Sequence, residues 1–442
     1  MISDYLDPAR APDEKPDRAQ MSAATRTLHD AVDRNAPWLH PEHRTIQRDL
    51  ISSAEVVAWQ EGKAGFMLRG DGAWSELPHL YARYGTVGTS ELIAKLRELE
   101  GARCAMVVDC GMQAVALVAD QLVHRGTHGI VMRQVYNKTR TFFQASAARV
   151  GGTITLVDDG DHAAIAAALL PETKFIFAET FTNPLVRAQD IPALVALARR
   201  IPGVKLLIDS TIATPWGLRK QLLAQGVDVV IGSLTKALGG QDTALGGYIA
   251  TDHADLANQI MDTIAMRGGI LDDERAARIT AGLPAAREAH ARRCATAARV
   301  AQFLASHPRV EQTFAPALPS HPDAAVIARD YVRTGSLLSF RVRGAGEDCH
   351  RHIADVLVSC TVPRYALSFD GLATKVNHHR TVSEYFTPDH VVARAGLDRL
   401  IRIGVGLEAA DDLIACLNWT LHHEAAITAA DLDAWRATRL SP

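Results

Sequence analysis

Between residues 90 and 251, short apolar runs alternate with longer segments in which apolar residues recur every three or four positions. The apolar runs are "CAMVVD", "GIVMRQVY", "TITLVD", "KFIFAET", "KLLIDS", "DVVIGS" and "GGYIAT". Runs of this length indicate buried strands, whereas "SELIAKLRELEG" has the spacing of an amphipathic helix that ends at a glycine. The alternation therefore predicts an α/β fold with a mostly parallel sheet covered by helices on both faces.

The same pattern predicts three regions. Residues 1–75 have no strong period and are interpreted as an N-terminal arm or extension. Residues 76–282 form the large α/β domain, and residues 283–442 form a connecting helix and a small C-terminal α+β domain. The Ala- and Arg-rich stretch 253–306 is expected to be one long connecting helix, and "RKQLLAQG" is expected to be a short helix.

The overall composition excludes several classes of function. The chain has 442 residues, 48% of them hydrophobic and 22% charged, with a formal net charge of −3. This balance is typical of a globular protein and gives no electrostatic reason to expect nucleic acid or a membrane as partner. The polar N-terminus lacks the apolar core of a signal peptide, which predicts a cytoplasmic protein. The six cysteines lack CxxC spacing, so neither a zinc site nor a disulfide framework is expected.

Polar side chains follow five of the predicted strands. In open α/β sheets, ligands bind where the carboxyl ends of strands meet the amino ends of helices. The residues at these points are Cys110-Gly111-Met112, Tyr136-Asn137-Lys138-Thr139, Glu179 to Pro184, Asp209-Ser210-Thr211 and Ser233 to Lys236. Together they offer a helix amino end, an aromatic ring, an amide, a carboxylate, hydroxyls and an amine.

This set has the chemistry that pyridoxal 5′-phosphate (PLP) requires. Its aldehyde needs an amine, and its ring nitrogen needs a carboxylate that keeps the ring protonated. Its phosphate suits hydroxyls and free N–H groups at a helix amino end, and its flat ring suits an aromatic neighbour. The sequence therefore predicts a PLP site, and no metal site.

From about residue 80 to 420, the chain resembles the fold-type I, PLP-dependent Cys/Met metabolism enzymes. These include cystathionine γ-synthase, cystathionine γ- and β-lyases, methionine γ-lyase and the O-acyl-homoserine sulfhydrylases. The matching pieces are "YARYG…ELIAKLRELEG", "GMQAV", "ETFTNPL", "IDSTIATP", "SLTKALGG", "LGGYI" and "LIRIGVGLEAADDLIACL". The resemblance implies the PLP-dependent transferase fold, with a mostly parallel, seven-stranded-type sheet in the large domain.

The resemblance also implies roles for residues on the cofactor side. Lys236 matches the lysine that forms a Schiff base with PLP and later moves protons along the substrate. Asp209 matches the carboxylate beside the pyridine nitrogen; taken alone, it could instead be a helix N-cap. The residues matched to phosphate binding are Ser233, Thr235 and the N–H groups of Gly111 and Met112.

Further matches concern residues around the cofactor ring and the substrate. Tyr136 matches the tyrosine that stacks on the ring and assists proton transfer at the leaving group. Asn183 matches an asparagine near the cofactor's 3-oxygen, although a turn before Pro184 would also explain it. Arg402 matches the arginine that holds the substrate α-carboxylate, and Ser368 lies in a substrate loop.

Tyr81 and Arg83 match a pair that reaches the phosphate of a neighbouring subunit. The resemblance thus implies a homotetramer built as a dimer of dimers, with active sites shared between subunits. Without the resemblance, Arg83 would be one of many surface arginines. The pairs His378-His379 and His422-His423 are expected to be solvated loop or helix-end residues rather than metal ligands.

The chain departs from the family where the substrate is expected. "YGGT" becomes "YNKT" at 136–139, "GGHSD" becomes "GGQDT" at 239–243, and "SLGGxESL" becomes "SFDGLATK" at 368–375. Asn137 and Lys138 would add a polar group and a cation beside the Tyr136 ring. The hypothesis is a retained PLP core with an unusual nucleophile or leaving group.

These observations predict a γ-replacement on an activated homoserine-type amino acid through a vinylglycine-type intermediate. The alternative is a C–S lyase that eliminates the γ- or β-substituent of methionine, cystathionine or cysteine and releases a 2-oxo acid and ammonia. A non-catalytic protein with the same fold is the third hypothesis. The retained set of Lys236, Asp209 and Arg402 argues against it, because a scaffold has no need of all three.

Overall fold

The computed structural model describes residues 17–27, 53–54, 56–61, 81–239 and 241–440. Most of the predicted arm, residues 1–75, therefore lies outside the described residues. Within its described part, residues 53–54 and 56–61 are helical.

The larger sheet has seven strands in the order β1-β7-β6-β5-β4-β2-β3. Only β7 runs against the others, because it is antiparallel to both β1 and β6. The strands are β1 (Cys104–Val108), β2 (His128–Met132), β3 (Thr153–Val157), β4 (Thr173–Glu179), β5 (Lys205–Asp209), β6 (Val229–Ser233) and β7 (Gly247–Thr251). The predicted α/β fold with a mostly parallel sheet is confirmed, and the apolar runs predicted to be strands form this sheet.

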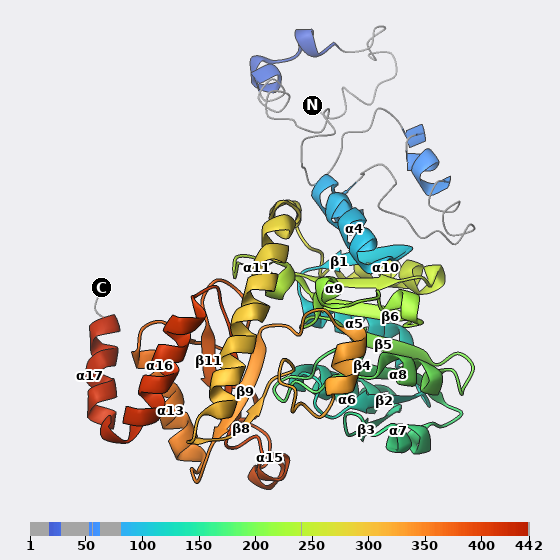
Figure 1. Ribbon diagram of the computed structural model, residues 1–442. Helices are drawn as coiled ribbons and strands as arrows, with labels where there is room; N and C mark the ends of the chain where they lie inside the picture. The colour runs from blue at the N-terminus through green and yellow to red at the C-terminus, as the bar shows by residue number, and fades with distance from the viewer. Residues whose placement is uncertain (1–16, 28–52, 55, 62–80, 240, 441–442) are drawn as a thin grey trace, which may run out of the picture.

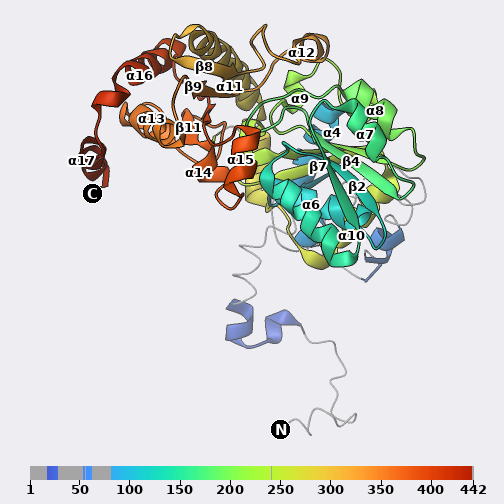
Figure 2. The same ribbon diagram turned by 90° about the horizontal axis from the view of Figure 1, so that it is seen from below.

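Helices lie on both sides of this sheet, with α8 on one side and α6 and α10 on the other (Figure 2). They are η5 (Ala82–Tyr84), α4 (Val87–Glu100), α5 (Gly111–Leu122), α6 (Asn137–Val150), α7 (His162–Ala168), α8 (Ile191–Ala198), α9 (Thr214–Gly217), η6 (Leu223–Gln225) and α10 (Ala254–Arg267). Thr86 caps the start of α4, and Gly101 ends it in a left-handed conformation. The helix expected over "RKQLLAQG" is wrong: only η6 forms there, because the chain enters this segment extended, with Leu218 bridged to Tyr331 and the Arg219 N–H donating to the carbonyl of Asp330.

A smaller sheet lies beside the first, with strand order β10-β11-β12-β9-β8. Its strands are β8 (Val310–Phe314), β9 (Leu337–Val342), β10 (Arg364–Tyr365), β11 (Lys375–His378) and β12 (Ile401–Gly404). Its helices and turns are α12 (Ala324–Asp330), α13 (Glu347–Ser359), α14 (His379–Ser383), α15 (Asp389–Ala395), α16 (Ala410–His423), η8 (Glu424–Ala426) and α17 (Ala429–Leu440). Three of these strands, β8, β10 and β11, are short or rich in polar residues, so that no apolar run in the sequence marks them.

The helix α11 (Asp273–Ser306) runs from the larger sheet to the smaller one (Figure 1). The single helix expected over 253–306 is wrong. Gly268 and Gly269 both have positive φ, 79° and 77°, and separate α10 from α11. Leu283 belongs to the core of the larger sheet and Ala297 to that of the smaller sheet. The predicted boundary at residue 283 therefore lies inside α11 and stays a prediction.

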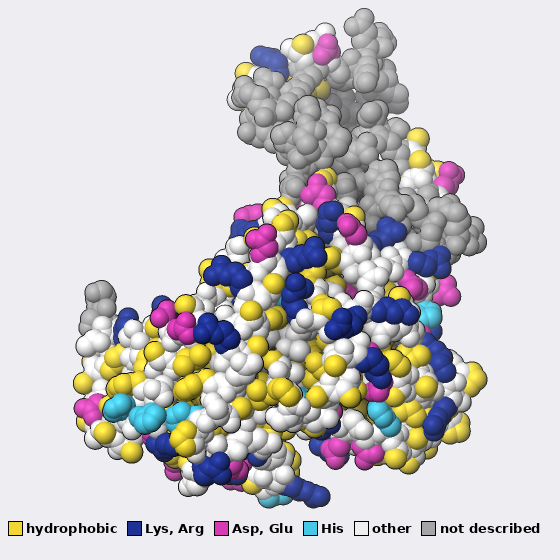
Figure 3. Space-filling model, viewed as in Figure 1, with side chains coloured by type: hydrophobic (Ala, Val, Ile, Leu, Met, Phe, Trp, Pro, Cys, Tyr) yellow, Lys and Arg dark blue, Asp and Glu magenta, His cyan; other side chains and the backbone are white. Residues whose placement is uncertain are grey.

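On the face shown in Figure 3, basic and acidic side chains are interspersed over both parts of the molecule. None of the helices within the described residues is long and apolar enough to cross a membrane. All six cysteines carry free thiols.

Candidate active site

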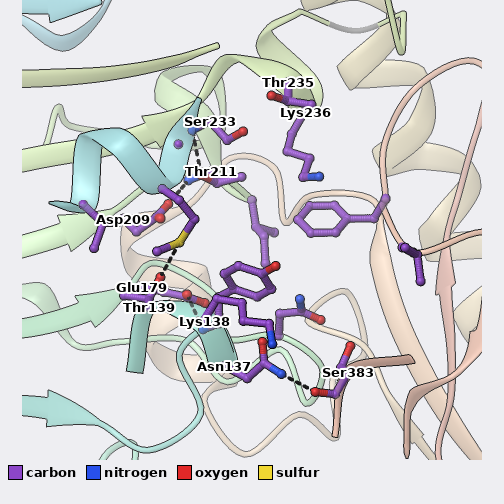
Figure 4. A pocket seen from close by; sticks show the side chains of 18 of the residues that line it. Asn137, Lys138, Thr139, Glu179, Asp209, Thr211, Ser233, Thr235, Lys236 and Ser383 are labelled. Carbon is purple, nitrogen blue, oxygen red and sulfur yellow. Dashed lines mark hydrogen bonds between the residues drawn. The ribbon is translucent and has the colours of Figure 1, made fainter. Parts of the chain in front are cut away.

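A cavity of about 420 Å³ lies at the carboxyl ends of β4, β5 and β6 (Figure 4). Side chains of the smaller domain line its other side, from the loop that contains Leu367 and Phe369 and from α14. The predicted site residues that line it are Lys236, Asp209, Ser233, Thr235, Gly111, Met112, Tyr136, Asn183 and Arg402. The fold thus brings together residues from 111 to 402.

Two carboxylates lie at one end of the cavity. Asp209 and Glu179 are paired neighbours at the ends of β5 and β4. The N–H of Thr211 donates to Asp209 (2.8 Å), and the N–H of Tyr136 donates to Glu179 (2.7 Å). Burial raises the pKa of both carboxyls, and the charge of Asp209 raises the pKa of Glu179 further. At this end of the cavity, one of the two carboxyl groups can therefore hold a proton while the other holds a negative charge.

Backbone N–H groups and hydroxyls gather at a second end. The helix α5 begins at Gly111, and a Cβ at this position would lie 3.1 Å from the Cβ of Ser233. The N–H of Ser233 donates to the Thr211 hydroxyl (2.9 Å). The Thr235 hydroxyl contacts the backbone of Gly246, accepting from its N–H at 3.2 Å. The glycine lets the amino end of α5 approach the end of β6, which is a suitable place for an anion.

Lys236 lies in η7 (Leu234–Leu238), a π-helical turn that follows β6, and its own backbone departs from helical geometry (φ −93°, ψ −135°). Its Nζ donates to the hydroxyl of Ser368 (2.5 Å) and lies 5.0 Å from the ring centroid of Phe369. Burial lowers the pKa of the amine to about 8, although the negative charge of Asp370 acts to raise it. The amine is therefore neutral far more often than that of an exposed lysine.

Arg402 lies on β12 and is buried at the boundary between the two sheets. Its guanidinium donates to the carbonyl oxygens of Leu367 (2.7 Å) and Ser368 (3.2 Å) and to Oδ1 of Asn183 (3.2 Å). Burial lowers its pKa to about 10, so that it stays positively charged at neutral pH.

Tyr136 precedes α6, and its side chain is 42% exposed toward the cavity mouth. The next two residues connect α6 to the smaller domain. The Asn137 amide donates to the carbonyl of Ser383, and Lys138 Nζ lies 5.4 Å from the ring centroid of Tyr385. The two departures from the family motif therefore line the cavity, as Figure 4 shows.

Tyr81 and Arg83 do not reach the cavity of their own chain. The Arg83 guanidinium lies 5.1 Å from the centroid of the Tyr81 ring, and Arg83 lines a small cleft beside Met261. Their contribution to a neighbouring subunit stays a prediction.

The interpretation of His378 and His379 as solvated residues is wrong, because both are buried. The ring of His378 hydrogen-bonds to Thr381 (2.8 Å) and to the carbonyl of Asp398 (2.7 Å). No apolar run in the sequence marks β11, the four-residue strand that carries His378 into the core. His422 and His423 are exposed at the end of α16, as expected. Within the described ranges, no group of three His, Cys, Asp or Glu side chains is arranged to hold a metal ion.

Glu179, Thr211, Phe369 and Tyr385 are among the lining residues that were given no role from the sequence. Glu179 ends β4 and Thr211 follows β5, and these positions at strand ends were a usable signal. Phe369 and Tyr385 come from loops of the smaller domain, where the sequence shows no period that would place them.

Comparison with known proteins identifies the same family that the sequence motifs resemble. A family model described as "Cys/Met metabolism PLP-dependent enzyme" matches residues 64–422. Cystathionine γ-synthase 1 of Arabidopsis thaliana is 32% identical over 76% of this chain, which spans 58% of that protein. L-methionine γ-lyase of Porphyromonas gingivalis is 28% identical over 91% of this chain and 98% of its own length. O-succinylhomoserine sulfhydrylase of Pseudomonas aeruginosa is 32% identical over 77% of this chain and 83% of its own.

Solved structures are similar over most of the fold. Cystathionine γ-synthase of Xanthomonas oryzae pv. oryzae, in complex with aminoacrylate and cysteine, has a TM-score of 0.74 at 27% identity. This match covers 79% of this chain and 89% of the other. Cystathionine γ-lyase of Lactobacillus plantarum, complexed with L-serine, has a TM-score of 0.72 at 28% identity, covering 78% and 89%.

Proposed function

This chain belongs to the Cys/Met metabolism PLP-dependent enzymes, and we propose that it catalyses a γ-replacement on an activated homoserine-type amino acid. The family supports a γ-synthase or γ-lyase reaction in Cys/Met metabolism. The observation that carries the choice of replacement is the extent of the cavity. It continues beyond Lys236 and Tyr136 to Lys138 and Tyr385, which leaves room for a second reactant beside the γ-carbon.

The donor set of the cavity fits PLP. Lys236 would hold it covalently, and Asp209 would pair with its ring nitrogen. Its phosphate would lie between the amino end of α5 and the hydroxyl of Ser233. The close approach of Gly111 and Ser233 supports this placement, because a side chain at position 111 would fill the space between them.

When bound, PLP supplies an aldehyde for the substrate amino group and a ring that withdraws electrons from the bonds to the α-carbon. Beside the α- and β-carbons of the substrate, the amine of Lys236 would act as the base. With a pKa of about 8, it would accept the α-proton, release it again, and only then accept a β-proton. Ser368, 2.5 Å from Nζ, positions the amine between these transfers.

Arg402 would bind the substrate α-carboxylate, because its fork of N–H groups meets both oxygens of a carboxylate at once. Its contacts with Asn183 and with the carbonyls of Leu367 and Ser368 fix the orientation of the fork. Tyr136 would lie against the cofactor ring and transfer a proton to the departing γ-group.

Supplying substrates separately and in pairs tests the proposal. Purified holoenzyme is incubated with O-acetyl- or O-succinyl-L-homoserine, with and without a thiol, and the products are identified by mass spectrometry. We expect a thioether only when both reactants are present. S-adenosylmethionine is tested in the same way, because its sulfonium is also a leaving group.

A C–S lyase is the second candidate, and a specific similarity favours it. The L-methionine γ-lyase of Porphyromonas gingivalis matches nearly its whole length to this chain. Efficient release of a 2-oxo acid and ammonia from methionine or cystathionine alone would establish the lyase and contradict the replacement.

We further propose a homotetramer in which Tyr81 and Arg83 complete the phosphate site of a neighbouring subunit. Both residues lie outside the cavity of their own chain, which supports this arrangement. Mixing Arg83→Ala subunits with Lys236→Ala subunits should restore activity in hybrid sites, as measured against either variant alone.

A further inference from the structure

The outer end of the cavity has a cation that is paired with no carboxylate among the described residues. Lys138 lines it from the first turn of α6, with its Nζ 5.4 Å from the centroid of the Tyr385 ring. Figure 4 shows Lys138 and Asn137 on the side of the cavity that faces Ser383, with Lys236 and Thr235 across from them. Lys138 has no carboxylate partner within 4 Å in the part of the chain that the structure describes.

The acidic groups nearby are already occupied. Glu384, next to Tyr385, lies 3.8 Å from the guanidinium of Arg140 and accepts from the Thr387 hydroxyl (2.5 Å). Glu179 and Asp209 lie at the ends of β4 and β5 and accept from the backbone N–H groups of Tyr136 and Thr211. The outer end is therefore positively charged, and a negatively charged group would be favoured there.

The walls that lead to Lys138 are apolar. Leu245, Leu367, Phe369 and Val382 line the cavity; Phe369 lies beside Lys236, and Val382 precedes Ser383, whose carbonyl accepts from Asn137. Leu245 and Leu367 are 57% and 73% exposed in the single chain, so that a ligand in the cavity can cover them. A ligand that packs against these walls and reaches Lys138 would have an apolar segment with a negatively charged group at its end.

From this arrangement we infer that the outer end binds a carboxylate at the end of a short apolar segment, and that Lys138 is the specificity-determining residue. The inference rests on the proposed function, since the segment is part of a group on the γ-side of the substrate. Such a carboxylate has two sources: the acyl leaving group of the amino acid, or the incoming thiol.

A binding experiment tests the inference without requiring turnover. L-2-Aminosuberate and L-2-aminooctanoate have side chains of similar length, but only the former ends in a carboxylate. Their dissociation constants for the holoenzyme are measured by calorimetry. We expect the wild type to prefer the carboxylate about twofold to fivefold, the range for one partly exposed ion pair. Lys138→Met should abolish the preference, Lys138→Glu should reverse it, and Lys138→Arg should retain it.

The matched control is Arg149→Met, which removes an exposed cation from the last turn of the same helix. It should leave the preference unchanged. An equal preference in the wild type and in Lys138→Met, or a preference that Arg149→Met also removes, would overturn the inference. Absence of turnover with every activated homoserine would contradict the proposed function instead, and would leave this binding result readable.

Two kinetic arms then distinguish the sources of the carboxylate. In the first, O-succinyl- and O-acetyl-L-homoserine are compared with 2-mercaptoethanol as the common thiol. In the second, 3-mercaptopropionate and 2-mercaptoethanol are compared with O-acetyl-L-homoserine as the common donor. A carboxylate preference in kcat/KM that Lys138→Met removes identifies the leaving group in the first arm and the nucleophile in the second. If Lys138→Met changes neither ratio, Lys138 does not select the substrate.

Discussion

The two sides of the cavity are built differently. On the cofactor side, Asp209 and Ser233 end neighbouring strands of one sheet, and backbone hydrogen bonds fix them in place. On the substrate side, Leu367 and Tyr385 belong to loops of the smaller domain and are largely exposed. The chain keeps the family motifs on the first side and departs from them on the second. The sheet thus sets which chemistry is available, and the loops set which molecule undergoes it.

Side-chain contacts join the two sides across the domain boundary. Lys375 of β11 forms an ion pair with Asp242, in the loop after Lys236, and also donates to the carbonyl of Asp370. The buried Arg293 of α11 donates to the carbonyl of Gly371 (2.7 Å). These contacts hold the substrate loop against the lysine, and four of the residues they join lie in motifs that depart from the family.

Removing the amine on the cofactor side has the largest expected effect. Lys236→Ala should lower kcat at least about 10³-fold, because the general base that moves the α- and β-protons is lost. Steady-state kinetics with the substrate pair that supports turnover provides the measurement. Lys95→Ala, which removes a lysine on α4 paired only with Glu98, should retain normal kcat. Similar activities in the two variants would show that Lys236 is not the catalytic base and that the cofactor side does not carry the chemistry.

Arg402→Lys tests the residue at the boundary between the two sides. Lysine keeps the charge but loses the forked geometry, so KM for the amino acid should rise about tenfold to a hundredfold. The value of kcat should fall less than kcat/KM, since the base is untouched. A normal KM would mean that the α-carboxylate binds elsewhere.

The lowered pKa of Lys236 predicts a pH dependence for cofactor uptake. Only the neutral amine attacks an aldehyde, and its fraction grows as pH rises toward the pKa of about 8. The rate of PLP binding to the cofactor-free chain, followed by absorbance, should increase about tenfold per pH unit below 8 and then level off.

Asp370, on the substrate side of the cavity, allows a second test. Its carboxylate raises the pKa of Lys236, whereas burial lowers it. Asp370→Asn should therefore move the plateau to lower pH. An uptake rate that keeps rising to about pH 10, as for an exposed lysine, would contradict the account.

The contact between the domains should have the smallest effect. Lys375→Met removes the ion pair with Asp242 but keeps the length of the side chain. Because one partly exposed pair contributes about 1 kcal/mol or less, KM should rise only about twofold to fivefold, with PLP affinity unchanged. Equal losses of substrate and cofactor affinity would show that the two sides are not separable.

The sequence predicts the cofactor side far better than the substrate side. Asp209 and Lys236 follow strands whose apolar runs are unmistakable, and the parallel sheet places all such strand ends at one edge. Tyr385 and the buried His379 depend on β11, a strand of four residues with a polar sequence. Asp370 interacts with Lys236 only because α11 and the smaller sheet bring the loop there. No local pattern carries that long-range information.

The central claim is that Lys236 holds the cofactor. Borohydride reduction of the PLP-loaded enzyme makes the covalent link permanent, and peptide mapping by mass spectrometry then locates it. We predict a pyridoxyl label on the peptide that contains Lys236 and on no other lysine peptide. A label at another lysine, or complete lack of labelling, would contradict the account.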